Sequence, residues 1–170
     1  GIGFAAAEAM GEAGARLVLV GRDEQRLATC AESVRRTGAE ATVCAVDLTA
    51  DAAPDHVVAA ALDGVRPGIG QQVAPFLHGL QTPPLDEVVT VVINDLSALP
   101  SGDQIVFVLD DFHLITAPSV LDSVGLLLHR LPPGLRMALV TRTDPPLPLA
   151  RLRASGQLAE LRSADLRFTL

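Results

Sequence analysis

Short apolar runs bounded by polar or turn-forming residues predict five strands along this chain. The runs are rich in Val, Leu and Ile, which is typical of strands buried on both faces of a parallel sheet. We expect strands near residues 15–20, 41–46, 104–109, 135–141 and 158–162.

Stretches with apolar residues at helical spacing separate these runs. Asp23 is a suitable N-cap for a helix that ends near Thr37, and Pro118 begins a helix with leucines along one side. Further helices are predicted before Gly14 and over residues 54–63, 71–80, 83–96 and 150–154. Alternating helices and strands predict an α/β fold, with a parallel sheet flanked by helices on both faces.

Composition narrows the class of protein. The chain has 170 residues, enough for one domain with a hydrophobic core. No apolar run approaches the roughly 18 residues of a membrane span, and the N-terminus does not resemble a signal peptide. Cys30 and Cys44 fit no metal-binding spacing, so we expect buried thiols in a reducing compartment. We therefore expect a cytoplasmic location and no membrane partner.

Charge and missing residue types exclude several functions. The net charge is −7, and no basic cluster stands out, which argues against direct nucleic-acid binding. The chain contains no Lys, Tyr or Trp, so mechanisms that require a lysine or a tyrosine are excluded for these residues. His113 has no second ligand at suitable spacing, which favours a packing or turn role over metal binding.

Charged residues follow two of the predicted strands. Asp110 and Asp111 come directly after 104–109, and Arg142 ends the run over 135–141. The carboxyl ends of parallel strands meet at one edge of a sheet, where such folds bind ligands. An acid that holds Mg²⁺ and an arginine that contacts phosphate predict a nucleotide site. Two simpler interpretations are a strand end with an N-cap and an ordinary surface arginine.

Residues 1–50 resemble the N-terminal part of a short-chain dehydrogenase/reductase. The matching strings are GIGFAAAEAMGEAGARLVLVGRDEQRL and AEATVCAVDLTA. The resemblance implies that Gly1 and Gly3 belong to the glycine-rich turn that approaches the cofactor pyrophosphate. It also implies that Arg22 selects the 2′-phosphate of NADP and that Asp47 lies near the adenine.

The dehydrogenase resemblance is incomplete. That family's catalysis uses a Tyr-x-x-x-Lys pair, and this chain has neither residue type. The strand and the first glycine that precede Gly1 in the family are missing. Residues 1–50 therefore resemble an NADP-binding remnant without hydride transfer. The alternative for Arg22 is a solvated or helix-capping side chain.

Residues 51–170 resemble the ATPase module of MalT/LuxR-type transcriptional regulators, which are signal-transducing P-loop NTPases. The matching strings are PPLDEVVTVVINDLSALP, IVFVLDDFHLI and LHRLPPGLRMALVTRTDPPLPLARLRASGQLAELRSADLRFT. The resemblance implies that Asp110 is the Walker B acid that holds Mg²⁺ and that Asp111 polarises the attacking water. It implies that Arg142 is a sensor arginine for the terminal phosphate of ATP.

This second resemblance lacks its Walker A loop, whose lysine no residue here can replace. We expect weak or lost binding of ATP with Mg²⁺ and no hydrolysis. The main hypothesis is thus a fragment or fusion that carries part of an ATP-dependent LuxR-type regulator. The alternatives are the NADP-dependent dehydrogenase remnant and a non-catalytic α/β packing module.

Both resemblances lack the first strand of their own sheet, which normally lies near its centre. The two segments could therefore share one sheet or remain separate. We expect an exposed edge or a gap in the sheet, through which copies of the chain would self-associate.

Overall fold

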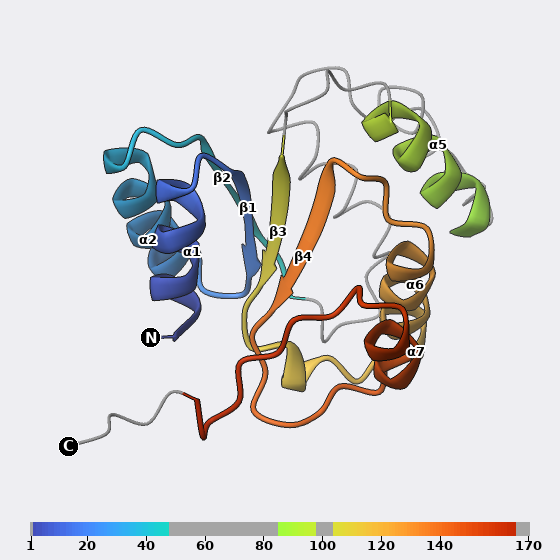
Figure 1. Cartoon of the computed structure of the whole chain (residues 1–170). Helices are drawn as coiled ribbons and strands as arrows, with labels where there is room; N and C mark the ends of the chain where they lie inside the picture. Colours follow the sequence, from blue (N-terminus) through green and yellow to red (C-terminus); the bar gives the residue numbers. More distant parts are fainter. Residues whose placement is uncertain (1, 48–84, 98–103, 166–170) are drawn as a thin grey trace.

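The computed structural model describes residues 2–47, 85–97 and 104–165. The helices predicted over 54–63 and 71–80 lie outside the described residues, as does Gly1. Figure 1 shows a sheet with helices on its two sides.

One parallel sheet organises the fold. Its strands are β1 (Arg16–Gly21), β2 (Ala41–Ala45), β3 (Ile105–Leu109) and β4 (Leu135–Leu139). They lie in the order β2-β1-β3-β4, and every neighbouring pair is parallel. The predicted fold class and four of the five predicted strands are therefore confirmed.

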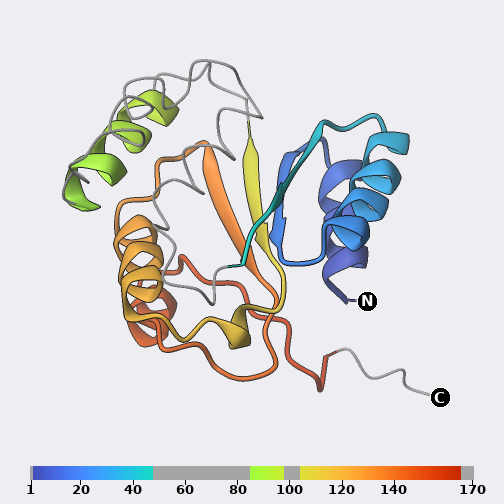
Figure 2. The ribbon, with the colours of Figure 1, turned by 180° about the vertical axis from the view of Figure 1, so that it is seen from behind.

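Helices cover both faces of this sheet. On one face lie α1 (Ile2–Glu12) and α2 (Glu24–Arg36), and on the other lie α5 (Leu85–Ser97), α6 (Pro118–His129) and α7 (Leu149–Ala154). The same two layers are visible from behind (Figure 2). None of these helices combines the length and hydrophobicity that a membrane span requires.

Local signals fix where the helices begin and end. Asp23 has extended backbone angles, and its side chain accepts a hydrogen bond from the Arg26 backbone N–H at 3.0 Å, as expected of an N-cap. Gly38 follows α2 with a φ of 92°, a conformation that costs glycine little. Pro118 occupies the first turn of α6, where its missing N–H leaves no helical bond unmade.

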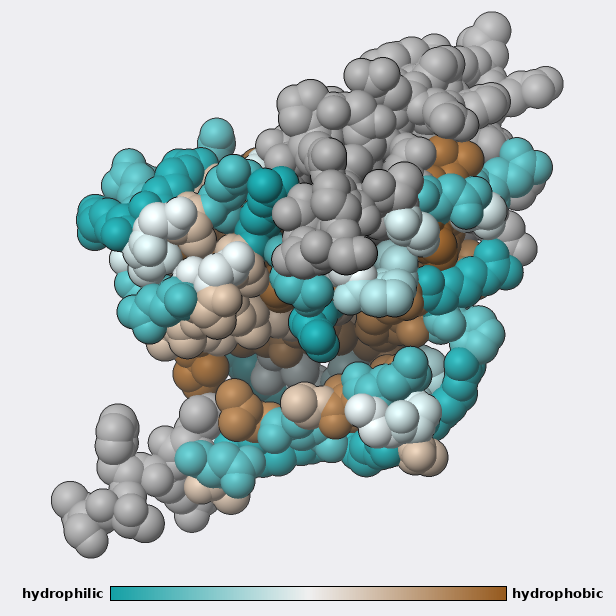
Figure 3. Space-filling model, turned by 45° about the horizontal axis from the view of Figure 1, so that its top comes forward, coloured by the Kyte–Doolittle hydropathy of each residue, from teal (hydrophilic) through white to brown (hydrophobic). Residues whose placement is uncertain are grey.

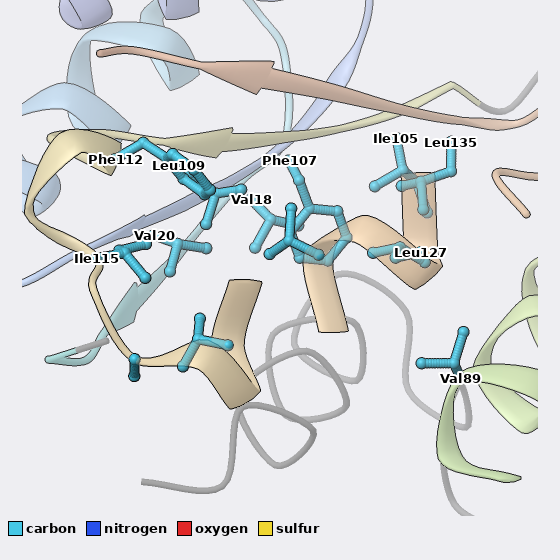
Figure 4. Close-up of a cluster of buried hydrophobic side chains, with 13 residues drawn as sticks. Val18, Val20, Val89, Ile105, Phe107, Leu109, Phe112, Ile115, Leu127 and Leu135 are labelled. Carbon is cyan, nitrogen blue, oxygen red and sulfur yellow. The ribbon is translucent and has the colours of Figure 1, made fainter. Parts of the chain in front are cut away.

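Side chains alternate between the two faces of the sheet, as period-two strands require. Leu17 and Leu19 of β1 pack with Val106 and Val108 of β3 in the core beneath α1 and α2. The residues between them point to the opposite core, where α6 packs (Figure 4). That second core contains Val18, Val20, Ile105, Phe107, Leu109, Val120, Val124 and Leu127.

Strand β3 joins the two segments that resemble different families. Its ladder with β1 sets Val18 opposite Phe107 and Val20 opposite Leu109. Phe107 is 2% exposed, so its side chain is buried in the core that both segments form. The two segments therefore share one sheet, and no gap separates β1 from β3. Of the predicted edge or gap, β3 closes the gap, and among the strands that the structure describes β2 and β4 form the two edges.

The fifth predicted strand, over 158–162, is wrong. This stretch forms no strand, and Leu161 is 77% exposed. Ion pairs hold it instead: Arg153 Nε donates to Glu160 Oε2 at 2.7 Å, and Arg162 pairs with both Glu160 and Asp144. The apolar residues that suggested a strand are too few to bury a face, so charge pairing decides the conformation.

The outer surface of the described residues is largely polar on the face seen in Figure 3. Hydrophilic residues dominate the outer sides there, and hydrophobic residues show in smaller patches between them. Self-association through a sheet edge stays a prediction.

Glu160 provides a pH test of the ion-paired segment. The hydrogen bonds from Arg153 and Arg162 lower the pKa of Glu160 from 4.5 to about 2. Because the folded pKa is depressed, the ion pairs stabilise the segment fully above pH 4.5 and are lost as the pH falls towards 2. The Arg153 Nε–H resonance should follow this titration by NMR, with a midpoint near 2.

A midpoint near 4.5 would show that Glu160 is unpaired in solution. The control is Glu160→Gln, which removes the titrating group and should abolish the transition of that resonance. Because these groups are exposed, we expect a local change and little effect on global unfolding.

Candidate functional site at the carboxyl edge of the sheet

The two predicted site strands end at the same edge of the sheet. The Asp110 backbone N–H donates to the Val20 carbonyl at 3.2 Å, and the Val140 N–H donates to the Leu109 carbonyl at 2.9 Å. The ladder therefore continues to the ends of β1, β3 and β4. Asp110 follows β3 directly at this common edge, and Arg142 follows β4 after two further residues; their predicted roles in one site stay predictions.

Charges alternate along this edge. The residues that follow the strands in the order β2-β1-β3-β4 are Asp47, Arg22, Asp110 and Arg142. Acids and arginines therefore alternate in the order in which the strands reach this edge of the sheet. The arginines at such an edge would attract the phosphate groups of a ligand, and the aspartates would repel them.

The exposure of the arginines suits contact with a ligand. Arg22 and Arg142 are both exposed, and within the described ranges neither guanidinium forms an ion pair or a hydrogen bond. Asp47 is exposed as well. The binding roles predicted for Arg22, Asp47 and Arg142 stay predictions, as does the role of Gly1, which lies outside the described residues.

The amino end of α1 meets the Asp110 carboxylate. A Cβ added at Gly3 would lie 3.1 Å from Asp110 Oδ1 and 3.2 Å from Val140 Cγ2. Only a residue without a side chain permits this approach at its present distance. A carboxylate at a helix N-terminus is favourable by about 0.3–1 kcal/mol because unpaired N–H groups and the helix dipole attract negative charge.

Arg26 completes this contact from α2. Its Nη2 lies 3.9 Å from Asp110 Oδ2, and the Asp110 side chain is 35% exposed. The negative charge of Asp110 also reaches the interior below α1. Burial raises the pKa of the Cys30 thiol, and the charges of Glu8 and Asp110 raise it further.

Asp111 adopts a different geometry from Asp110. Its φ of 52° and ψ of 35° lie in the left-handed region, which aspartate enters more readily than most residues. It precedes the short helix η1 (Phe112–Leu114), whose first residue donates its N–H to the Val140 carbonyl at 2.9 Å. The turn thus directs the two adjacent acids differently, and the catalytic role predicted for Asp111 stays a prediction.

Metal binding receives no support from the side-chain arrangement. In residues 2–47, 85–97 and 104–165, no three His, Cys, Asp or Glu side chains gather in a way that could hold a metal ion. His113 lies within η1, in keeping with the predicted turn role. Ligation of Mg²⁺ by Asp110 would need ligands from elsewhere, including a nucleotide phosphate.

If NADP were bound at this edge as the dehydrogenase resemblance implies, its two ends would meet opposite charges. Arg22, for which the resemblance predicts contact with the 2′-phosphate, is exposed. A dinucleotide pyrophosphate needs the N–H groups at the amino end of α1, and the Asp110 carboxylate already lies there. The residues therefore suit the adenosine 2′-phosphate end and oppose the pyrophosphate.

Sequence reasoning missed Arg26 and the contact between Gly3 and Asp110. The N-cap at Asp23 places Arg26 in the first turn of α2, which is a signal that could have directed attention to it. The contact itself joins positions more than a hundred residues apart and depends on β3 pairing with β1. No local pattern carries that information.

Comparison with known proteins finds both resemblances. Residues 1–75 match the family model described as short chain dehydrogenase. The match continues past residue 50 into residues that the structure does not describe, so the predicted segment boundary near 50 stays a prediction.

A relative and a solved structure add to this comparison. The chain is 40% identical over 62 residues to the HTH-type transcriptional regulator MalT of Serratia proteamaculans (strain 568). That stretch is 36% of this chain and only 7% of the length of that regulator. A metagenomic short-chain oxidoreductase solved in complex with NADP is 19% identical with a TM-score of 0.38, covering 94% of this chain and 87% of its own.

The contact between Gly3 and Asp110 predicts energetic coupling. Gly3→Val should crowd the Asp110 carboxylate, and Asp110→Ala should relieve part of that cost. In a double-mutant cycle measured by urea unfolding, we expect a coupling of at least about 0.5 kcal/mol.

The matched control combines Gly3→Val with Asp122→Ala, which removes an exposed acid from α6 on the other face. Those two effects should add within about 0.5 kcal/mol. Additivity in both cycles would contradict the contact.

Proposed function

We propose that this chain is a non-catalytic nucleotide-binding module that recognises the adenosine 2′-phosphate end of NADP. The observation that carries the proposal is the position of Arg22. It is exposed directly after β1, at the carboxyl edge of the sheet, within the residues that match the dehydrogenase family model. A charge-assisted contact between a guanidinium and a phosphate is the interaction that distinguishes NADP from NAD.

The strand arrangement supports this proposal. Dinucleotide-binding folds place their strands in the order 3-2-1-4 and bind the cofactor at the carboxyl ends. Aligned with that order, β2 of this chain takes the position of strand 3 and β1 that of strand 2. Strand β3 then takes the position of strand 1, and β4 that of strand 4. The carboxyl end of β1 then corresponds to the part of such a site that binds the adenosine of the cofactor.

The proposal excludes hydride transfer by the dehydrogenase mechanism in these residues. That mechanism requires a tyrosine as acid and base and a lysine that lowers its pKa, and the chain has neither. Binding without turnover is therefore the expected behaviour of this segment.

The effect of Arg22→Ala on cofactor preference tests the proposal. Affinity for NADP and for 2′-AMP, which carries the same adenosine 2′-phosphate, should fall about tenfold, or about 1.4 kcal/mol, in calorimetric titrations. Affinity for NAD should change little because NAD lacks the 2′-phosphate. Arg36→Ala is the control, since it removes an exposed arginine from the opposite end of α2.

Two results would contradict the proposal. One is equal affinity of the native chain for NADP and NAD, and the other is absence of saturable binding to both NADP and 2′-AMP. A loss in Arg36→Ala as large as in Arg22→Ala would show that net charge, rather than Arg22, decides binding.

A second candidate function is a remnant of the ATP-dependent switch of a LuxR-type regulator. It is favoured by the 40% identity with MalT over 62 residues and by the common edge of Asp110 and Arg142. Under this candidate, ATP binds in the presence of Mg²⁺ through Asp110, and Asp110→Ala abolishes that binding. ATP affinity that is indifferent to both Mg²⁺ and Asp110 would exclude it.

A further inference from the structure

Asp110 has a place in the site that neither resemblance assigns to it. It comes from the MalT-like segment, yet its carboxylate lies close to Gly3 at the amino end of α1 in the dehydrogenase-like segment, where an added Cβ would be 3.1 Å from Oδ1. It also lies 3.9 Å from Arg26 of α2. Both neighbours belong to the half of the site that would receive an anionic cofactor.

We infer that Asp110 acts as an intramolecular substitute for a cofactor phosphate and determines which nucleotides the site accepts. This inference rests on the proposed function. A carboxylate at the amino end of α1 uses the positive end of the helix dipole, as a pyrophosphate would. The site therefore admits adenosine 2′-phosphates and discriminates against ligands that place a pyrophosphate beside α1.

The position of β3 explains why the carboxylate lies there. In a dinucleotide-binding fold the first strand leads through a glycine-rich turn into the first helix, leaving space for the pyrophosphate. Here β3 stands in that place beside β1, and the residue that follows it is an aspartate. Gly3 has no side chain to hold the carboxylate away, since even a Cβ would lie 3.1 Å from Asp110 Oδ1.

The negative charge of Asp110 is what would separate ligands with a pyrophosphate from ligands without one. Two anions a few ångströms apart repel by an amount that corresponds to roughly a tenfold change in affinity when solvent partly screens them. Arg26 does not cancel this repulsion, because its guanidinium already pairs with the Asp110 carboxylate. Arg22 lies at the end of β1 and serves the other end of the ligand.

The experiment compares two ligands on two proteins. NADP carries the pyrophosphate, and 2′-AMP carries the adenosine 2′-phosphate without it. In the native chain, NADP should bind no more tightly than 2′-AMP despite its larger surface. Asp110→Asn keeps the shape of the side chain and removes its charge, so NADP affinity should rise roughly tenfold while 2′-AMP affinity stays the same.

Asp122→Asn is the charge-matched control, because it removes an exposed acid on α6 and should change neither affinity. Circular dichroism of each variant verifies folding. If Asp110→Asn does not fold, the ratio of NADP to 2′-AMP affinity in the native chain decides. A ratio well above one then overturns the inference.

The outcomes separate this inference from the proposed function. Unchanged NADP affinity in Asp110→Asn, with 2′-AMP still bound, overturns the role of Asp110 and leaves the proposed function standing. An equal rise for both ligands also overturns it, since the effect would then be one of general charge. Absence of binding for both ligands in both proteins overturns the inference and the proposed function together.

Discussion

The parallel ladder between β1 and β3 is the interaction on which the rest of this structure depends. It joins two segments that resemble unrelated proteins and sets Val18 opposite Phe107. Both hydrophobic cores need this ladder, because each contains side chains from both strands. Each side chain of this size contributes about 1.5–3 kcal/mol when fully buried, and the alternation of faces distributes that gain over the two cores.

The same ladder brings together the residues of the candidate site. With β3 beside β1, the acid that follows β3 meets the helix that precedes β1. In the families that the two segments resemble, residues at these positions would serve different nucleotides: Gly3 a dinucleotide and Asp110 a magnesium-bound triphosphate. In this chain Gly3 and Asp110 lie close together, so the Asp110 carboxylate takes the space in which a dinucleotide phosphate would approach Gly3. Arg22 lies farther along the edge, so its predicted role does not require Asp110 to move.

Much of this fold could be predicted from the sequence because its signals are local. The run from Ile105 to Leu109 predicts a buried strand, and Asp23 predicts the start of α2; the structure has both. The strand prediction over 158–162 was wrong because it rested on a few apolar residues. Ion pairs of the charged residues in and around this stretch decide its conformation. The contact of Gly3 with Asp110 could not be predicted, since strand order is set by packing of the whole sheet rather than by spacing along the chain.

Nuclear Overhauser contacts across the sheet test the shared ladder most directly. With β1 and β3 paired, contacts are expected between Val18 and Phe107 and between Val20 and Leu109, in a parallel register. The Asp110 amide, which donates to the Val20 carbonyl, should be protected from hydrogen exchange. If β1 instead contacts β2 alone, or if β3 pairs with it in another register, the two segments do not form the site described, and the roles assigned to Arg22 and Asp110 are wrong.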